Sequence, residues 1–116
     1  MFAVIRHYHF DKKDGAEIDR AVHEEFVPII RKAKGFQQYY WLDTGEGEGA
    51  SFGVFEDKAG ADESGRLASN YVRDHLSKLL TEKPEIIEGP VAANGAVTAG
   101  EGRGRADTVA RWDLMI

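Results

Sequence analysis

The chain has 116 residues, of which 42% are hydrophobic and 30% charged, a composition typical of a single globular domain. Its formal net charge of −5 argues against a nucleic-acid partner, because phosphate binding needs a basic surface. The absence of cysteine excludes disulfides, thiolate metal sites and a cysteine nucleophile. The sequence shows neither a signal peptide nor an apolar run of membrane-spanning length, so we expect a cytoplasmic protein without a membrane partner.

The first part of the chain predicts a strand followed by a long helix. The strand covers 2–10 and carries large side chains on both faces. Apolar residues then recur at helical spacing over about 16–34. Pro28 lies inside this pattern and lacks a backbone donor, so we expect the helix to kink or break near Glu24.

Two paired strands are predicted next. Gly35 closes the first helix as a C-cap, and the aromatic stretch "FQQYYWLD" at 36–43 follows as a strand. The loop "TGEGEG" at 44–49 is typical of a hairpin, and "ASFGVFED" at 50–57 is the returning strand.

A second helix and a last strand complete the predicted domain. Asp57 is a good N-cap for a helix over about 59–80. Pro84 ends that helix, and a short strand follows at 85–91. The order βαββαβ indicates an α+β ferredoxin-like sandwich, in which two helices cover one face of an antiparallel sheet.

The aromatic strand raises the question of what covers the other face of this sheet. Simple alternation places Phe36, Gln38, Tyr40 and Leu42 on one face and Gln37, Tyr39, Trp41 and Asp43 on the other. Because both faces carry rings and the helices cover only one, we expect a second copy of the chain to cover the other. We therefore predict a homodimer that packs through the face carrying Tyr39 and Trp41.

The sequence divides at about residue 91. The segment 1–91 forms the predicted domain, and 92–116 is a glycine- and alanine-rich C-terminal extension without apolar periodicity. The extension ends in "VARWDLMI", in which Trp112 is an anchor for an apolar groove. We expect 109–116 to dock on the partner subunit, with docking on its own subunit as the alternative.

Two stretches resemble a known family. "KGFQQYYWL" and "FGVFEDKAGADESGRLASNYVRDHL" resemble the dimeric α/β-barrel superfamily and, within it, the antibiotic-biosynthesis-monooxygenase-like domains. The resemblance covers roughly 1–91. It implies that the ferredoxin-like βαββαβ sandwich forms a dimeric α/β barrel, and that a ligand lies between the sheet and the helices. Its members include cofactor-independent monooxygenases, haem-degrading enzymes and stress-induced proteins.

Among the residues that the resemblance covers, His75 and Tyr71 are the candidate catalytic residues. His75 lies on the second helix and can act as a general base or a haem ligand. Haem degraders of this superfamily carry a tryptophan about ten residues before their histidine ligand, whereas this chain has Gly65 there. Tyr71 can hydrogen-bond a phenolic or quinone oxygen. The alternatives are a boundary histidine with a structural hydrogen bond and a tyrosine that only fills the core.

Arg6, Trp41 and Phe26 are the candidate substrate-binding residues. Arg6 can hold a substrate anion, but an ion pair with Glu56 or Glu88 on a neighbouring strand is the favoured alternative. Trp41 can line a pocket for a flat aromatic ligand, although the dimer interface is favoured. Phe26 lies on the apolar stripe of the first helix, and can instead fill the space that a ligand would need.

His7 and His9 point the same way from the first strand, roughly 7 Å apart, a spacing that can chelate a metal. A complete site needs a third ligand such as His75, Glu56 or Glu88. Because histidine pairs in strands are also common without metal, we assign no metal and no cofactor.

The preferred functional hypothesis is a small-molecule-binding monooxygenase-like domain that oxidises an aromatic or phenolic substrate with O₂ and without a cofactor. In that mechanism His75 helps remove the phenolic proton, and the substrate supplies the electron. The alternatives are a non-enzymatic dimer that binds a hydrophobic ligand or serves in a stress response, and a haem-binding oxygenase.

Overall fold

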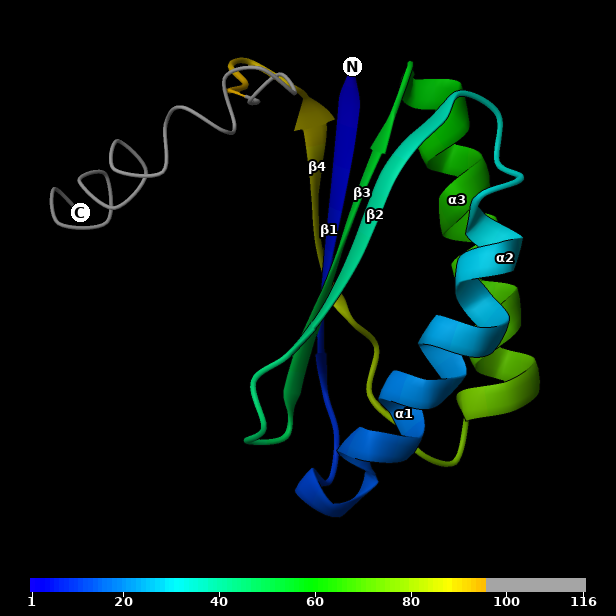
Figure 1. Ribbon diagram of the computed structural model, residues 1–116, viewed down its shortest axis with the longest axis vertical. Coiled ribbons are helices and arrows are strands. Elements are labelled where there is room, and N and C mark those ends of the chain that lie inside the picture. The colour runs from blue at the N-terminus through cyan, green and yellow to red at the C-terminus, as the bar shows by residue number, and fades with distance from the viewer. Residues whose placement is uncertain (96–116) are drawn as a thin grey trace, which may run out of the picture.

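The computed structural model describes residues 1–95, so the predictions about docking of the C-terminal extension lie outside the described residues. Four strands and a set of helical segments follow one another in the predicted order (Figure 1). The elements are β1 (Phe2–His9), the 3₁₀ turn η1 (Lys12–Asp14), α1 (Gly15–Ala21), η2 (Val22–Phe26), α2 (Val27–Ile30), β2 (Phe36–Asp43), β3 (Glu48–Phe55), α3 (Lys58–Tyr71), η3 (Val72–Leu76) and β4 (Glu85–Pro90).

The four strands form one antiparallel sheet in the order β2-β3-β1-β4. All the labelled helices lie on the same side of this sheet, and the opposite side carries none of the described elements (Figure 1). The predicted α+β ferredoxin-like fold is therefore confirmed.

Both long helices contain one wider, π-helical turn. In the first, η2 separates α1 from α2, and the N–H of Val27 bonds to the carbonyl of Val22, five residues back. The distortion predicted near Glu24 is thus present. Its cause is Pro28, which cannot donate to the Glu24 carbonyl. In the second helix η3 follows α3 directly, and no proline accompanies it. Such turns are often found at functional sites.

A bulge in β2 decides which of its rings face the helices. Phe36 pairs with Phe55 of β3, and Gln38 with the preceding residue Val54, so Gln37 is an extra residue. The extra residue reverses the alternation, and Tyr39 therefore joins Phe36 on the helix side of the sheet. The prediction that Tyr39 and Trp41 form the open face is wrong for this reason.

The open face carries a different set of apolar side chains. Tyr40 and Leu42 are 57% and 64% exposed, and the neighbouring strands add Phe52 and Ile87. The strand pairing brings these side chains together, because Tyr40 is paired with Phe52 and Ile5 links Phe52 to Ile87. The predicted second apolar face of the sheet therefore exists, at different positions from those expected.

The core lies between the sheet and the helices. Its fully buried members include Val4 from β1, Ile18 and Ile30 from the first helix, and Phe55 from β3. One of the two predicted helix caps is present. Asp57 accepts a hydrogen bond from the N–H of Gly60 at 3.1 Å at the start of α3. The prediction of Gly35 as a C-cap is wrong, because α2 ends at Ile30 with Arg31 as its C-cap; Gly35, with a φ of 69°, lies in the turn that leads into β2.

Candidate functional site

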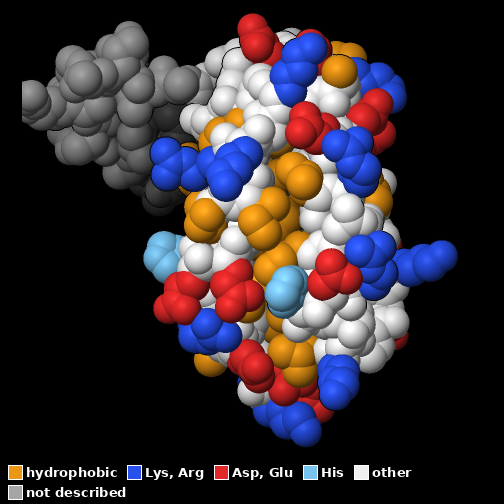
Figure 2. Space-filling view, turned by 90° about the vertical axis from the view of Figure 1, so that its right-hand side faces the viewer, with side chains coloured by type: hydrophobic (Ala, Val, Ile, Leu, Met, Phe, Trp, Pro, Cys, Tyr) orange, Lys and Arg blue, Asp and Glu red, His pale blue; other side chains and the backbone are white. Residues whose placement is uncertain are grey.

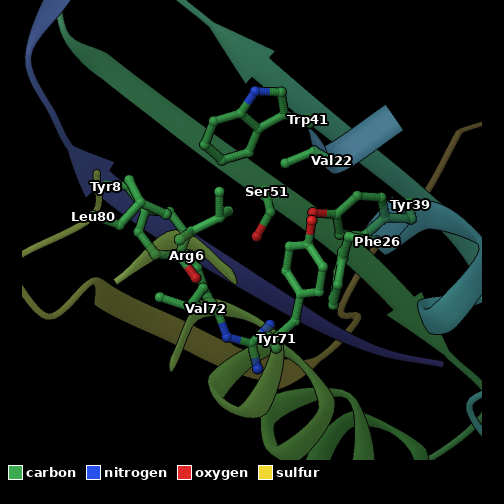
Figure 3. A pocket seen from close by; sticks show the side chains of 12 residues that line it. Arg6, Tyr8, Val22, Phe26, Tyr39, Trp41, Ser51, Tyr71, Val72 and Leu80 are labelled. Atoms are coloured by element: carbon green, nitrogen blue, oxygen red, sulfur yellow. The ribbon is translucent and has the colours of Figure 1, made fainter. Parts of the chain in front are cut away.

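A small cavity lies between the sheet and the two π-helical turns. Its volume is about 30 Å³, room for a water or two or for the polar head of a ligand. Side chains from both layers line it (Figure 3): Arg6, Tyr8, Val22, Phe26, Tyr39, Trp41, Ser51, Ala68, Tyr71, Val72, Leu76 and Leu80. Four of the five predicted site residues are in this set, and His75 is not.

An open groove of about 480 Å³ adjoins the cavity. Arg6 and Tyr8 line both spaces, as do Ala68, Val72 and Leu80. The outer part of the groove is formed by the segment that leads from η3 to β4. Its volume is in the range of small-molecule sites. Together the two spaces can take a ligand whose body lies in the groove and whose head points into the cavity.

Arg6 lies where cavity and groove meet. It is only 8% exposed, yet within residues 1–95 no carboxylate comes within ion-pair distance of its guanidinium. The favoured alternative of an ion pair with Glu56 or Glu88 is therefore not found. The guanidinium lies against α3 at Gly65, where an added Cβ would come within 2.9 Å of Arg6 Nη2. Because glycine has no side chain, it leaves room at this position for the guanidinium of Arg6.

Tyr71 joins the cavity to a carboxylate on the other helix. Its hydroxyl donates to Glu25 Oε1 at 2.6 Å and lies 3.4 Å from the carbonyl oxygen of Ala21. Burial, together with the hydrogen bond to Glu25, raises the pKa of the Tyr71 hydroxyl, which therefore stays protonated at neutral pH. The hydroxyl oxygen keeps a lone pair with which it can accept a hydrogen bond from a ligand.

His75 lies behind Tyr71. Its ring stacks on the Tyr71 ring with 4.8 Å between centroids and 29° between planes. The side chain is exposed and lines neither the cavity nor the groove. Its contact with the site therefore passes through Tyr71.

Aromatic rings form the other walls of the cavity. Phe26 lies between Tyr39 and Tyr71, with centroids 5.6 and 5.4 Å away, and Trp41 packs 5.9 Å from Tyr8. Burial raises the pKa of Tyr8 and of Tyr39, so both phenols stay neutral and contribute packing and polarity.

Asp19 and Asp43 form an acidic pair at the edge of the aromatic wall, and Asp19 holds the Trp41 indole. Its Nε1–H donates to Asp19 Oδ1 at 2.8 Å. Burial, and further the nearby Asp43, raise the pKa of Asp19, while the indole donor opposes this shift. The hydrogen bond orients the large ring toward the cavity, which is the pocket position that the sequence analysis considered less favoured.

Several residues of the site were missed in the sequence. Glu25 gives no signal, because its hydrogen bond to Tyr71 depends on how the two helices pack. Tyr39 was placed on the wrong face because of the bulge in β2. Tyr8 and Ser51 lie on the same sheet face as Arg6 and Trp41, since Arg6 and Trp41 are each paired with Ser51, and a correct register would have found both.

The outer surface on the helix side carries both apolar and charged side chains. Hydrophobic side chains form a column down the middle of that side, bordered by acidic and basic ones (Figure 2).

Among residues 1–95, no helix is long and apolar enough to cross a membrane.

The architecture and the cavity define a ferredoxin-like domain with a space for a small molecule between sheet and helices. No family profile matches the sequence, and no curated protein matches it. Solved structures share the fold. A monooxygenase from the gene ActVA-Orf6 of Streptomyces coelicolor, in complex with the ligand nanaomycin D, has a TM-score of 0.63 at 16% identity. The match covers 84% of this chain and 90% of that one.

Two further structures match to a similar degree. A putative antibiotic biosynthesis monooxygenase from Bordetella bronchiseptica has a TM-score of 0.66 at 11% identity and covers 79% of this chain and 97% of its own. A dimeric ferredoxin-like protein from an uncultured marine organism has a TM-score of 0.64 at 11% identity and covers 84% and 100%. At identities this low the comparisons establish the fold alone. The resemblance to the antibiotic-biosynthesis-monooxygenase-like domains is therefore confirmed as a resemblance in fold.

Proposed function

We propose that this protein is a homodimeric, monooxygenase-like domain that binds a flat aromatic anion between its sheet and its helices. The observation that carries the proposal is Arg6, a largely buried residue without a carboxylate partner among the described residues, whose guanidinium reaches the space where the cavity meets the groove.

A buried charge is costly unless it is paired and hydrogen-bonded. An anionic oxygen on a ligand supplies the missing partner, and the planar guanidinium suits a carboxylate or phenolate. Tyr8 lines both spaces and offers an aromatic ring to a flat ligand that lies in the groove. The structural neighbour that is in complex with nanaomycin D supports the binding of a small molecule by this fold.

Binding of 2-naphthoate tests the anion site, with the neutral 2-naphthamide as its matched control. A hydrogen bond to a charged group contributes about 1.5–3 kcal/mol. Arg6→Met keeps much of the side-chain volume and removes the charge, so it should weaken naphthoate binding by about tenfold or more. Binding of the amide should change little. Equal losses for both probes would mean that Arg6 only shapes the site.

The same geometry supports oxidation of a phenol by O₂. For 1-naphthol, one oxygen atom of O₂ becomes the new carbonyl oxygen at C4 and the other leaves as water. The water takes the hydroxyl proton and the C4 hydrogen, the substrate supplies the electrons, and the product is 1,4-naphthoquinone. Arg6, placed where the cavity meets the groove, would stabilise the phenolate that donates the first electron.

Tyr71 and Glu25 provide a route for the phenolic proton. A substrate hydroxyl in the cavity can donate to Tyr71 Oη while Tyr71 donates to Glu25, whose carboxylate is partly exposed. A proton that enters this chain at the substrate can leave at Glu25. The pair replaces His75 as the direct proton acceptor in the proposed mechanism.

Oxygen uptake with 1-naphthol tests the chemistry. We expect one O₂ per quinone formed without added metal or cofactor. Tyr71→Phe and Glu25→Gln should each lower turnover by about 10²-fold or more, the usual range for general acid–base groups, and leave naphthoate binding nearly unchanged. Turnover that survives in Tyr71→Phe would contradict the relay.

For His75 we propose a positioning role, through its stack on the Tyr71 ring. His75→Phe should then retain most of the turnover, and His75→Ala should lose part of it. Equal and complete loss in both variants would show that the imidazole itself moves the proton. Because His75 does not line the cavity, we propose no haem ligation through it.

A non-enzymatic ligand-binding protein is the second candidate. The observation in its favour is the small volume of the cavity, about 30 Å³, which Phe26 and Leu76 keep narrow. Naphthoate binding that depends on Arg6, without oxygen uptake from any phenol of a polycyclic panel, would favour this function.

The homodimer is proposed on the open face of the sheet. Tyr40, Leu42, Phe52 and Ile87 form an apolar surface there that the described residues leave uncovered. A second copy, related by a two-fold axis, covers it with an identical surface. The neighbour described as a dimeric ferredoxin-like protein supports this assembly.

A further inference from the structure

We propose that His7, His9 and Glu48 form a binding site for a divalent transition-metal ion, with Zn²⁺ as the ion of choice. The site lies on the open face of the sheet, on the side away from the cavity. It goes beyond the proposed function and does not depend on it.

The strand register brings the three side chains together. His7 and His9 are two residues apart in β1 and therefore project from the same face. Glu48, the first residue of β3, is paired directly with His9. Glu85, the first residue of β4, is paired with His7 from the other side. Two imidazoles thus lie between two carboxylates.

The distances suit a small tetrahedral ion. Glu48 Oε1 lies 3.2 Å from His7 Nε2 and 3.3 Å from His9 Nε2. One ligand atom from each residue lies within 4.8 Å of the other two. Zinc bonds of about 2.0–2.1 Å at tetrahedral angles place ligand atoms about 3.3–3.4 Å apart. Two of the three separations already have this value, and small rotations of the half-exposed imidazoles can supply the third.

Glu85 completes the arrangement as an orienting group. Its Oε1 lies 3.6 Å from Nδ1 of His7, the nitrogen that faces away from Glu48. Histidine ligands commonly donate their second ring N–H to a carboxylate, which fixes the tautomer that binds the metal. Within residues 1–95, no lysine or arginine pairs with Glu48 or Glu85, so the positive charge of the ion is free to compensate both carboxylates.

This site differs from the one considered in the sequence analysis. The third ligand is Glu48, rather than His75, Glu56 or Glu88. Glu88 is paired with Val4, a fully buried residue under the helices, and therefore belongs to the other face of the sheet. Two histidines and a carboxylate leave one tetrahedral position open, which water or a group from a second copy of the chain can fill.

Calorimetric titration of the full-length chain with Zn²⁺ after chelator treatment tests the proposal. We expect saturable binding of one ion per chain. His7→Ala, His9→Ala and Glu48→Gln should each weaken it by at least about tenfold, and Glu85→Gln should weaken it less. Co²⁺ should give the visible absorption of a tetrahedral site, which His9→Ala abolishes.

His23→Ala is the matched control, because His23 is an exposed histidine on the first helix, away from the sheet. It should bind Zn²⁺ like the unaltered chain. Far-ultraviolet circular dichroism confirms that each variant is folded, and Glu48→Gln preserves the shape of the side chain it replaces. The proposal is overturned by binding that survives in both His9→Ala and Glu48→Gln. Equal loss in His23→Ala, or no saturation below about 1 mM Zn²⁺, would also overturn it.

Discussion

Replacing Gly65 by alanine separates the role of Arg6 in ligand binding from any role in holding the fold. Gly65 lies in the middle of α3, and an added Cβ would come within 2.9 Å of Arg6 Nη2. Within residues 1–95, this nitrogen is the one atom outside the surrounding turns of α3 that such a Cβ would meet within 4 Å. Ordinary contact begins at 3.4 Å, so the guanidinium must retreat by about 0.5 Å. The arginine itself remains in place, with its charge intact.

The substitution should raise the stability of the protein and lower its affinity for the ligand. Alanine is favoured over glycine in a helix interior by about 1 kcal/mol, and the head of a flexible arginine can move at little cost, so the protein should become more stable. For a chain of this size the thermal midpoint should rise by about 4 °C. A displacement of about 0.5 Å spoils a charge-assisted hydrogen bond, and a loss of about 1 kcal/mol makes the dissociation constant for 2-naphthoate about fivefold larger.

Thermal unfolding at matched protein concentration and naphthoate titration measure both effects on one variant. Gly65→Ala should be more stable and bind the anion more weakly, with 2-naphthamide affected less. Unchanged naphthoate affinity would refute the placement of the ligand against Arg6. A marked loss of stability would refute the view that the guanidinium is free, because it would show that structural contacts fix it.

The remaining predictions concern the open face and the acidic pair. Leu42→Glu should convert the dimer to a monomer in light scattering, whereas Asn70→Glu, which adds the same charge on α3, should leave the dimer intact. A dimeric Leu42→Glu protein would rule out the proposed interface. The raised pKa of Asp19 should appear in a pH titration of the Trp41 indole N–H resonance as a midpoint above the usual aspartate range, which Asp43→Asn moves to lower pH. Because the folded state holds this proton more tightly, the contribution of Asp19 to stability falls as the pH rises through the raised pKa. A midpoint unmoved by Asp43→Asn would contradict the coupling.

The order of elements was predictable because each one depends on local chemistry. Asp57 marks the start of α3 by capping it with its side chain, and Pro28 distorts its helix by lacking a donor. The presence of two apolar sheet faces was predictable as well, since it rests on composition alone. Such features need no knowledge of what packs against what.

The assignment of rings to faces failed because a single extra residue reverses a period of two. Gln37 carries no signal that distinguishes a bulge from regular pairing, and the error moved Tyr39 and Trp41 to the wrong side of the sheet.

The partners of the charged residues also escaped prediction. The lack of an ion pair for Arg6 and the hydrogen bond between Tyr71 and Glu25 both arise from the spacing of elements far apart in the sequence. A carboxylate on a neighbouring strand was a reasonable partner for Arg6 from the strand order alone. Only the register shows which strand residues share its face.

A crystal structure of the full-length protein with 2-naphthoate would show directly whether Arg6 binds the anion. We expect the carboxylate about 2.7–3.2 Å from the guanidinium nitrogens of Arg6, with the rings in the groove that leads from the cavity toward β4. A ligand bound away from Arg6, or an Arg6 paired with a carboxylate of the protein over a closed cavity, would contradict it.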